Sequence, residues 1–383
     1  MKLKFGMVGG AGGGISPMHM RGATIDFMAE LTAGCFSRNA EKGRRQAEAW
    51  GVSDFSRVYP NYQVMAEEEG KKTGEDRLDF VVIVTPNDTH YEIAKAFLEQ
   101  DFPLVCDKPL ALTVEQAEEL ARIAKERNLP FAVTYTYSGY AMIRQAREMI
   151  ERGDIGEITY INAEYPQEWL ANALAQEGKE ESANAMWRLD PARAGESQAT
   201  ADIGTHIEFL VKAATGLSPE RVLAKFDHIP PDLEMESNTT ILCQYPNNVT
   251  GLLWASQIAI GHECDIRLRV FGTKGAVEWQ HQDANRLKVT KLGGPVQYYS
   301  ADAPYNYAES VRLSRTNPGH PEGLFEAFGN IYRSFMEILK ARKEGREPES
   351  FTFPTVEDGV NGVKFIHACV KSNAAGSVWV DVE

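Results

Sequence analysis

Short apolar runs alternate with amphipathic stretches through the first third of the chain. The runs predict five strands, at 3–8, 31–36, 78–84, 102–105 and 131–135. The stretches between them predict helices, at 18–30, 40–50, 62–70, 91–99 and one capped by Thr113. The run at 78–84 is continuous and β-branched, which is typical of a strand buried on both faces. Strands that alternate with helices predict a parallel, doubly wound sheet.

The pattern changes after Tyr137, where apolar and polar residues alternate within the strands. A helix at 140–152 is followed by predicted strands at 158–164, 222–227, 239–245, 249–258, 267–272 and 276–280. Short turn sequences such as Pro246-Asn247-Asn248 join several of these strands, which predicts an open, mostly antiparallel sheet. Helices at 321–344 and 356–373 end the chain. We therefore expect an α/β protein with a Rossmann-like domain over 1–137 and an α+β domain over 138–383.

Composition narrows the class of protein. The chain has 383 residues, of which 43% are hydrophobic, so packed cores are expected rather than disorder. A formal charge of −14 argues against a nucleic acid or an anionic membrane as partner. The cysteines are scattered and form no C-x-x-C pair, which indicates reduced thiols rather than disulfides or a zinc site. The scattered thiols therefore predict a cytoplasmic protein without a bound metal. No apolar run approaches membrane-spanning length.

A glycine loop directly follows the first predicted strand. It contains Gly9, Gly10, Gly12, Gly13 and Gly14. A strand, glycines and a helix are typical of a dinucleotide-binding loop, because glycines let the backbone approach a pyrophosphate and the helix N-terminus favours its charge. The third motif position holds Ala11 and the loop is longer than usual. A flexible glycine turn is the alternative.

The second predicted strand is followed by Ser37 and Arg38. NAD-preferring folds usually place an acid here for the ribose hydroxyls. A hydroxyl beside a guanidinium suits a 2′-phosphate, which favours NADP and leaves NAD open. The alternative is that Arg38 is an exposed arginine at a helix start.

The fourth predicted strand ends in Asp107-Lys108-Pro109. Pro109 disfavours the helical conformation at Lys108, so the lysine projects from the carboxyl end of a strand. Ligands of open α/β sheets bind at such ends, and a lysine there can hold a hydroxyl, a carbonyl or a phosphate. A surface lysine in a turn is the alternative.

Asp202 and His206 lie four residues apart at the start of an apolar helix. This spacing places both side chains on one helix face. A carboxylate can orient an imidazole and make it a proton acceptor near neutral pH. The alternative is that Asp202 caps the helix and His206 fills its first turn.

Together these motifs resemble the glucose–fructose oxidoreductase / inositol dehydrogenase / MocA family. The resemblance covers essentially the full chain. It rests on the glycine loop, on Asp107-Lys108-Pro109 in place of Glu-Lys-Pro, and on Asp202 with His206, in this order. It implies an NAD(P)-binding Rossmann domain over 1–137 and a substrate-binding and oligomerisation domain over 138–383. It also implies a homodimer or homotetramer.

The resemblance implies roles for individual residues. Lys108 would hydrogen-bond the reacting oxygen, His206 would accept its proton, and Asp202 would orient His206. The expected cofactor-binding residues are Gly9, Gly10, Gly12, Gly13, Gly14, Ser37, Arg38, Thr85, Pro86, Asn87, His90, Asp107, Trp187 and Arg188. Aromatic and polar groups near the domain junction suit a sugar or cyclitol ring, although packing in the core is an alternative for the aromatic residues. The candidates are Tyr137, Gln167, Arg188 and Asp190.

The resemblance predicts an NAD(P)-dependent dehydrogenase. It would oxidise a secondary hydroxyl of a sugar, sugar derivative or cyclitol to a ketone, or catalyse the reverse. Two alternatives stay open, an NAD-dependent glycoside hydrolase of the same family and a non-catalytic cofactor-binding regulator. The presence of Lys108, Asp202 and His206 argues against the regulator. The polar stretch 171–185 is expected to cover the site.

Overall fold

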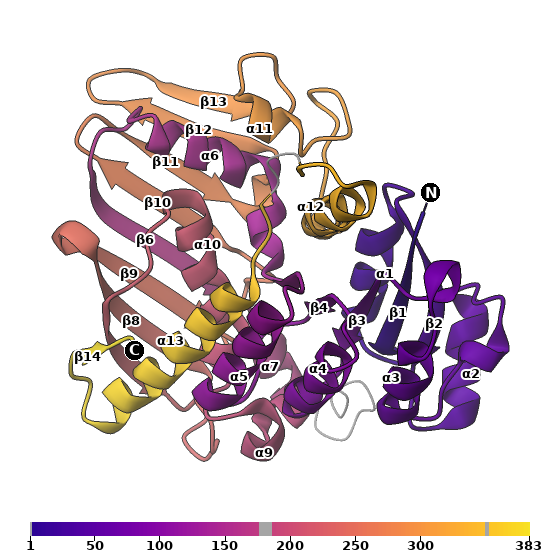
Figure 1. Ribbon diagram of the computed structural model, residues 1–383. Helices are drawn as coiled ribbons and strands as arrows, with labels where there is room; N and C mark the ends of the chain where they lie inside the picture. The colour runs from indigo at the N-terminus through magenta and orange to yellow at the C-terminus, as the bar shows by residue number, and fades with distance from the viewer. Residues whose placement is uncertain (1, 176–185, 349–351) are drawn as a thin grey trace. The chain divides into compact units, whose positions relative to one another are not determined.

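The computed structural model describes residues 2–175, 186–348 and 352–383 (Figure 1). The chain divides into two compact units, Met1–Thr136 with Leu324–Val360, and Tyr137–Gly323 with Asn361–Glu383. The segment Leu324–Val360, which we expected in the second domain, groups with the first unit. Most of the stretch expected to cover the site, 176–185, lies outside the described residues.

The first unit is built on a five-stranded parallel sheet with the order β2-β1-β3-β4-β5. The strands are β1 (Leu3–Gly9), β2 (Ala29–Cys35), β3 (Phe80–Val84), β4 (Leu104–Cys106) and β5 (Phe131–Val133). Every residue of β3 is buried, as its continuous apolar run predicts. Because the chain adds β2 on one side of β1 and β3 on the other, the topology reverses between β1 and β3. The predicted doubly wound parallel sheet is confirmed.

Helices connect these strands. They are α1 (Ser16–Thr24), α2 (Ala40–Ala49), α3 (Tyr62–Gly70), α4 (His90–Leu98) and α5 (Val114–Glu126). The Thr113 side chain caps α5 by accepting from the Gln116 amide, as predicted. The helix predicted over 18–30 is wrong in its second half. Phe27 has a left-handed φ of 56°, which ends the helical path, and residues from Ala29 pair in β2 instead.

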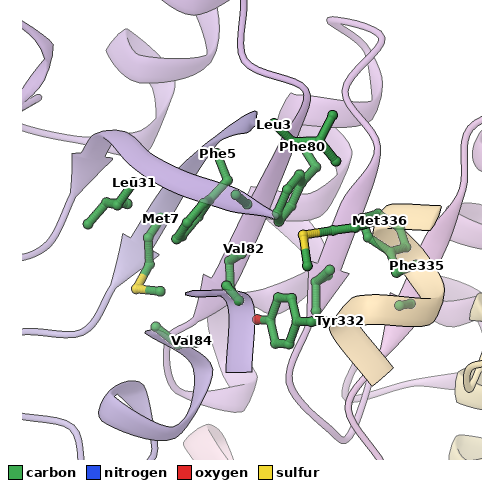
Figure 2. Close-up of a cluster of buried hydrophobic side chains, with 14 of the residues drawn as sticks. Leu3, Phe5, Met7, Leu31, Phe80, Val82, Val84, Tyr332, Phe335 and Met336 are labelled. Atoms are coloured by element: carbon green, nitrogen blue, oxygen red, sulfur yellow. The ribbon is translucent and has the colours of Figure 1, made fainter. Parts of the chain in front are cut away.

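A helix from a later part of the chain completes the core of the first unit. Helix α12 (Leu324–Glu344) packs against α1 and contributes apolar side chains to the cluster on β1 and β3 (Figure 2). Phe5 and Phe80 stack with ring centroids 5.3 Å apart, and Phe335 meets Phe80 edge-on at 5.5 Å. All three rings are fully buried. This burial explains why Leu324–Val360 belongs to the parallel-sheet unit.

The second unit is built on a nine-stranded mixed sheet with the order β13-β12-β11-β10-β6-β9-β8-β7-β14. The strands are β6 (Ile158–Pro166), β7 (Arg221–Asp227), β8 (Asn238–Tyr245), β9 (Val249–Ser256), β10 (Arg267–Gly272), β11 (Gly275–Gln280), β12 (Arg286–Lys291), β13 (Val296–Ser300) and β14 (Val380–Asp381). Within this sheet, β6 and β9 are the only described neighbours that pair in parallel, so the sheet is mostly antiparallel, as predicted.

Helices cover one face of this sheet (Figure 1). They are α6 (Ala141–Glu151), α10 (Thr205–Thr215) and α13 (Val356–Ala374). Shorter elements precede α10, namely α7 (Trp169–Ala175), η5 (Met186–Leu189), α9 (Pro191–Ala194) and the π-helical turn η6 (Thr200–Gly204), and α11 (Ala308–Val311) follows the sheet. On the other face, alternate side chains such as Tyr160, Leu252 and Trp254 are half-buried. Within the described ranges, no helix combines the length and apolarity needed to cross a membrane.

Candidate active site

The glycine loop lies at the carboxyl end of β1 and has a conformation that excludes side chains. Gly9 and Gly10 have φ values of 90° and 114°. A Cβ at Gly9 would lie 2.8 Å from the Val84 carbonyl oxygen, and one at Gly10 would lie 2.6 Å from the Trp50 ring. The Ser16 hydroxyl donates to the Gly10 or the Gly13 carbonyl oxygen, each 2.8 Å away, and so ties the loop to the start of α1. Uncovered backbone beside a helix N-terminus fits the pyrophosphate of a dinucleotide.

Other predicted cofactor residues lie at the same edge of the parallel sheet. Thr85, Pro86 and Asn87 follow β3, and Lys108 follows β4 two residues after its last strand residue. The loops after β1 and β3 flank the point where the strand order reverses, which is where doubly wound sheets bind nucleotides. The structure therefore brings the glycine loop, Thr85–Asn87 and Lys108 to one sheet edge.

Two cations lie near the end of β2 and the glycine loop. Arg38 is exposed, and the Ser37 hydroxyl accepts from the Asn39 amide at 3.1 Å. Lys42, in the first turn of α2, has its Nζ 2.9 Å from the position that a Cβ at Gly12 would take. Lys42 was not among the predicted residues, although a lysine one helical turn beyond Arg38 is a signal that sequence inspection can find. The pair favours an anionic group at this edge.

Asp107 fixes the turn that carries Lys108. Its carboxylate accepts from the Lys108 amide and from the Thr134 hydroxyl, both at 2.9 Å, and lies 3.9 Å from Nε2 of His19. Burial alone would raise the pKa of Asp107, but the electrostatic interactions with the nearby His19 and with Lys108 outweigh it and hold the pKa well below its usual range. His19 is fully buried, and its Nδ1 lies 2.8 Å from the Tyr332 hydroxyl on α12. Sequence reasoning missed His19 and Tyr332, because their contacts with Asp107 and with each other join distant parts of the chain.

His90 links the two loops at this sheet edge. Its ring is fully buried, with Nδ1 2.8 Å from the Pro109 carbonyl oxygen and Nε2 2.8 Å from the Thr85 carbonyl oxygen. We expected His90 to contact the cofactor, whereas both ring nitrogens face backbone carbonyls. The ring therefore connects the segment after β3 with the turn after β4.

In the second unit, His206 lies in the first turn of α10 and directly follows the π-helical turn that contains Asp202. The His206 ring packs edge-on against the Tyr137 ring, with centroids 4.9 Å apart. The hydroxyls of Tyr137 and Tyr165 are 2.6 Å apart. Burial raises the pKa of both tyrosines, so both remain neutral phenols at physiological pH. The structure thus brings together the candidate base and one candidate substrate residue.

A buried glutamine joins further predicted residues to Asp202. Gln257 Nε2 donates to Oδ2 of Asp202 at 2.8 Å, and Oε1 of Gln257 accepts from Gln167 Nε2 and from Trp169 Nε1. The Arg188 guanidinium lies 3.6 Å from Oδ1 of Asp202. Sequence reasoning missed Gln257, which was assigned to the interior of a longer strand. A polar residue immediately after a buried strand is the signal that could have revealed it.

The remaining predicted residues flank this network. The Arg188 guanidinium lies over the Trp187 ring, 4.6 Å from its centroid. Asp190 is exposed and caps α9, because its carboxylate accepts from the Ala192 amide at 3.0 Å. Arg188 is therefore the polar residue of this segment that reaches Asp202.

A buried carboxylate that sequence reasoning also missed holds the start of the π-helical turn. Glu236 accepts from the Thr200 amide at 3.0 Å, from the Gln198 amide at 3.1 Å and from the Ser197 hydroxyl. Burial raises the pKa of Glu236, and these hydrogen bonds oppose that effect. Glu236 therefore anchors the backbone that leads to Asp202.

The described residues include the cysteines and other potential metal ligands. All five cysteines are free, and four of them are buried. In the part of the chain that the structure describes, no group of three or more His, Cys, Asp or Glu side chains could hold a metal ion.

Comparison with known proteins defines the class. Residues 3–135 match the model of the oxidoreductase family with an NAD-binding Rossmann fold, and residues 143–278 match the GFO/IDH/MocA C-terminal domain. The protein is an NAD(P)-dependent oxidoreductase of the class that acts on CH–OH groups. The chain belongs to the GFO/IDH/MocA family, so the predicted family, fold class and enzyme class are confirmed.

Known proteins are similar to this chain over most or all of its length. The uncharacterized oxidoreductase YfiI of Bacillus subtilis is 35% identical over 387 residues, covering 99% of this chain and 96% of the relative. An inositol dehydrogenase homolog from Azotobacter vinelandii, solved with NAD+, is 33% identical with a TM-score of 0.93 and covers 100% of this chain and 97% of that one. Its complex with NADH and myo-inositol is 32% identical with a TM-score of 0.91 and covers 100% and 98% of the two chains. Levoglucosan dehydrogenase of Pseudarthrobacter phenanthrenivorans is 28% identical over 335 residues, 79% of each chain.

Proposed function

We propose that the protein is a dehydrogenase that oxidises a secondary hydroxyl of a sugar, sugar derivative or cyclitol to a ketone, or catalyses the reverse. The observation that carries the proposal is the position of Lys108, which follows β4 at the sheet edge that also bears the glycine loop. The ionised carboxylate of Asp107 fixes its backbone. The Azotobacter vinelandii homolog, which binds NADH and myo-inositol, supports a ring-shaped polyol as substrate.

The proposed chemistry divides between three side chains. Lys108 donates a hydrogen bond to the reacting oxygen and offsets the negative charge that develops on it. His206 accepts the hydroxyl proton as general base. Asp202, held by Gln257 and Arg188, keeps His206 oriented. When bound, the nicotinamide supplies the hydride acceptor.

Most of the residues that we propose to contact the cofactor belong to the carboxyl edge of the parallel sheet. The loop from Gly9 to Gly14 holds the pyrophosphate, and Thr85, Pro86 and Asn87 contact the nicotinamide half. Trp187 and Arg188 are the proposed cofactor contacts of the second unit. The cations Arg38, after β2, and Lys42, beside Gly12, would suit a ribose 2′-phosphate and support NADP over NAD. Asp107 holds the Lys108 turn from within the protein.

The proposed substrate contacts combine an aromatic ring with polar groups. Tyr137 offers a ring beside His206, while Gln167 and Arg188 offer hydrogen-bond donors that Gln257 and Asp202 already orient. Such a set suits the alternating faces and hydroxyls of a pyranose or cyclitol ring. Because Asp190 caps α9, we expect it to contribute less to substrate binding than Arg188.

A substrate panel tests the proposal. Cyclitols including myo-inositol, aldoses and the anhydrosugar levoglucosan are offered with NAD+ or NADP+, and reduced nicotinamide is followed by its absorbance. We expect turnover with at least one polyol and none in the Lys108→Met variant. Cleavage of a glycoside without net reduced nicotinamide would identify the hydrolase instead. Cofactor binding without turnover on any polyol or glycoside would favour the regulator.

A further inference from the structure

His90 has an unusual pair of hydrogen-bond partners. It is the first residue of α4, its ring is fully buried, and its nitrogens lie 2.8 Å from the carbonyl oxygens of Thr85 and Pro109. The two carbonyls belong to different segments, one after β3 and one after β4. Each distance is that of a well-formed hydrogen bond.

Both partners are acceptors, and this fixes the number of protons on the ring. A neutral imidazole carries one N–H and one lone pair, whereas a backbone carbonyl oxygen can only accept. A neutral His90 would therefore direct a nitrogen lone pair at a carbonyl oxygen at 2.8 Å, away from water. An imidazolium has two N–H groups and satisfies both carbonyls.

The half-buried His281 shows the contrast. His281 has its Nδ1 3.0 Å from the Cys264 carbonyl oxygen and its Nε2 3.0 Å from the Tyr140 hydroxyl. Because a hydroxyl can donate, a neutral ring satisfies both partners of His281. Burial lowers the pKa of His281, which agrees with a neutral ring. One partner of His281 can therefore donate a hydrogen bond, whereas both partners of His90 can only accept one.

The surroundings of His90 can accommodate a positive charge. Asp107, on the turn that His90 contacts, interacts electrostatically with His90, and this interaction favours the ionised carboxylate. His19 and Lys108 are the other titratable groups that act on Asp107 in this way. Asp107 is thus an anion within a group of three potential cations, and it compensates a buried imidazolium.

We propose that His90 is a positively charged positioning residue. As an imidazolium it clamps the Thr85 carbonyl to the Pro109 carbonyl, and so holds the cofactor segment Thr85–Asn87 in register with the turn that carries Lys108. The charge state follows from the two carbonyl partners alone. The effect on cofactor and turnover rests on the proposed function.

Nitrogen NMR of the full-length protein tests the charge state without any substrate. The ring nitrogens of 15N-labelled histidines are assigned through bonds and recorded at pH 8, above the ordinary imidazole pKa of about 6.5. We expect two proton-bearing nitrogens at His90, with and without NAD+, and one proton-bearing and one lone-pair nitrogen at His281. A lone-pair nitrogen at His90 under these conditions overturns the proposal, whatever the substrate panel shows.

Two substitutions test the clamp. His90→Gln keeps one donor and His90→Met keeps none at similar size, while the exposed His228→Gln is the matched control. We expect the NAD+ dissociation constant, measured by calorimetry, to rise in the order wild type, Gln, Met, with about a tenfold step for a lost charged hydrogen bond. Equal losses in the Gln and Met variants would mean that His90 only fills space, and would overturn the positioning role. The NMR result on the wild type decides the charge state even where a variant does not fold.

Discussion

Gln257 donates a hydrogen bond from its Nε2 to Oδ2 of Asp202 over 2.8 Å. The side-chain amide of Gln257 cannot flip without losing these contacts, because its oxygen accepts from Trp169 Nε1 and Gln167 Nε2. The strand end after β9 therefore orients the carboxylate in the π-helical turn before α10. A buried network in which every amide atom is engaged holds a single geometry.

Changing Gln257 should disturb Asp202 in two distinguishable ways. Gln257→Leu removes the donor, which we expect to cost about 1.5–3 kcal/mol of unfolding free energy and to lower kcat about tenfold. Gln257→Glu places a second carboxylate against Asp202, so activity should be lowest at high pH and should recover partly as the pH falls. The pH profile of kcat/KM, with the exposed Gln297→Glu as control, checks this. Parallel profiles for the Leu and Glu variants would contradict an interaction with Asp202.

Lys108 and His206 should matter for turnover more than for stability. Lys108→Ala and His206→Ala should each lower kcat about a hundredfold or more, the usual scale for a positioned acid–base group. If both act on one reacting oxygen, the double variant should lose less than the product of the single losses. Calorimetry should show that NAD+ still binds in all three. A folded, cofactor-bound single variant with a near-wild-type rate on the best polyol would exclude that residue from the chemistry.

The sequence predicted those elements whose signal lies in neighbouring residues. The continuous run of β3 and the Thr113 cap of α5 were predictable, because burial on both faces and a capping contact are written in neighbouring residues. Strand β12 was missed, since Arg286–Lys291 alternates apolar residues with three basic side chains in a short span. It pairs in the sheet only because β11 offers a free edge.

Contacts between distant residues were beyond the sequence patterns. Tyr332 reaches His19 from α12, and nothing near either residue marks the pairing. Asp202 and Gln257 were separately visible as polar residues beside apolar elements, but their hydrogen bond depends on how η6 packs against β9. Motifs therefore marked Lys108 and His206 as candidates, while the contacts of Asp107 and Asp202 became visible only in the fold.

Arg38 and Lys42 should select between the two nicotinamide cofactors. Arg38→Ala should weaken NADP+ binding much more than NAD+ binding, because the guanidinium suits a 2′-phosphate. Lys42→Ala should shift the preference in the same direction, since Lys42 follows Arg38 by four residues and would add a second cation for the 2′-phosphate. Dissociation constants for both cofactors, with the exposed Arg45→Ala as control, measure the ratio. Equal losses for NAD+ and NADP+ would remove the argument for NADP.

The partly exposed face of the nine-stranded sheet should be a contact between copies of this chain. Leu252 and Trp254 are neighbours on β9 that point to the face opposite α6 and α10, and both are half-buried. We expect a homodimer or homotetramer by light scattering at micromolar concentration. Leu252→Arg should shift the mass toward that of one chain, because a charge there opposes burial of an apolar face. A wild-type mass of a single chain would refute the association.

Asp107 should give the protein a specific loss of stability in acid. The pKa of Asp107 is lowered in the folded protein, so below pH 4 the unfolded chain binds its proton before the folded chain does. The stabilisation is therefore complete above the ordinary pKa of about 3.9 and is lost as the pH falls toward the folded value. Asp107→Asn lacks this charge, so we expect it to be about 1–2 kcal/mol less stable than wild type at pH 7.

The difference between wild type and Asp107→Asn should shrink as the pH is lowered from 5 to 3, because the unfolded wild-type chain then binds a proton at Asp107 while the folded protein keeps the carboxylate ionised. Urea unfolding at pH 7, 5, 4 and 3 measures the free energies, and the exposed Asp232→Asn is the matched control. Asparagine can still accept from Thr134 and from the Lys108 amide, so a difference that stays constant with pH would assign the effect to packing. A difference that falls with pH would assign it to the carboxylate charge beside His19 and Lys108, the groups that keep Asp107 ionised.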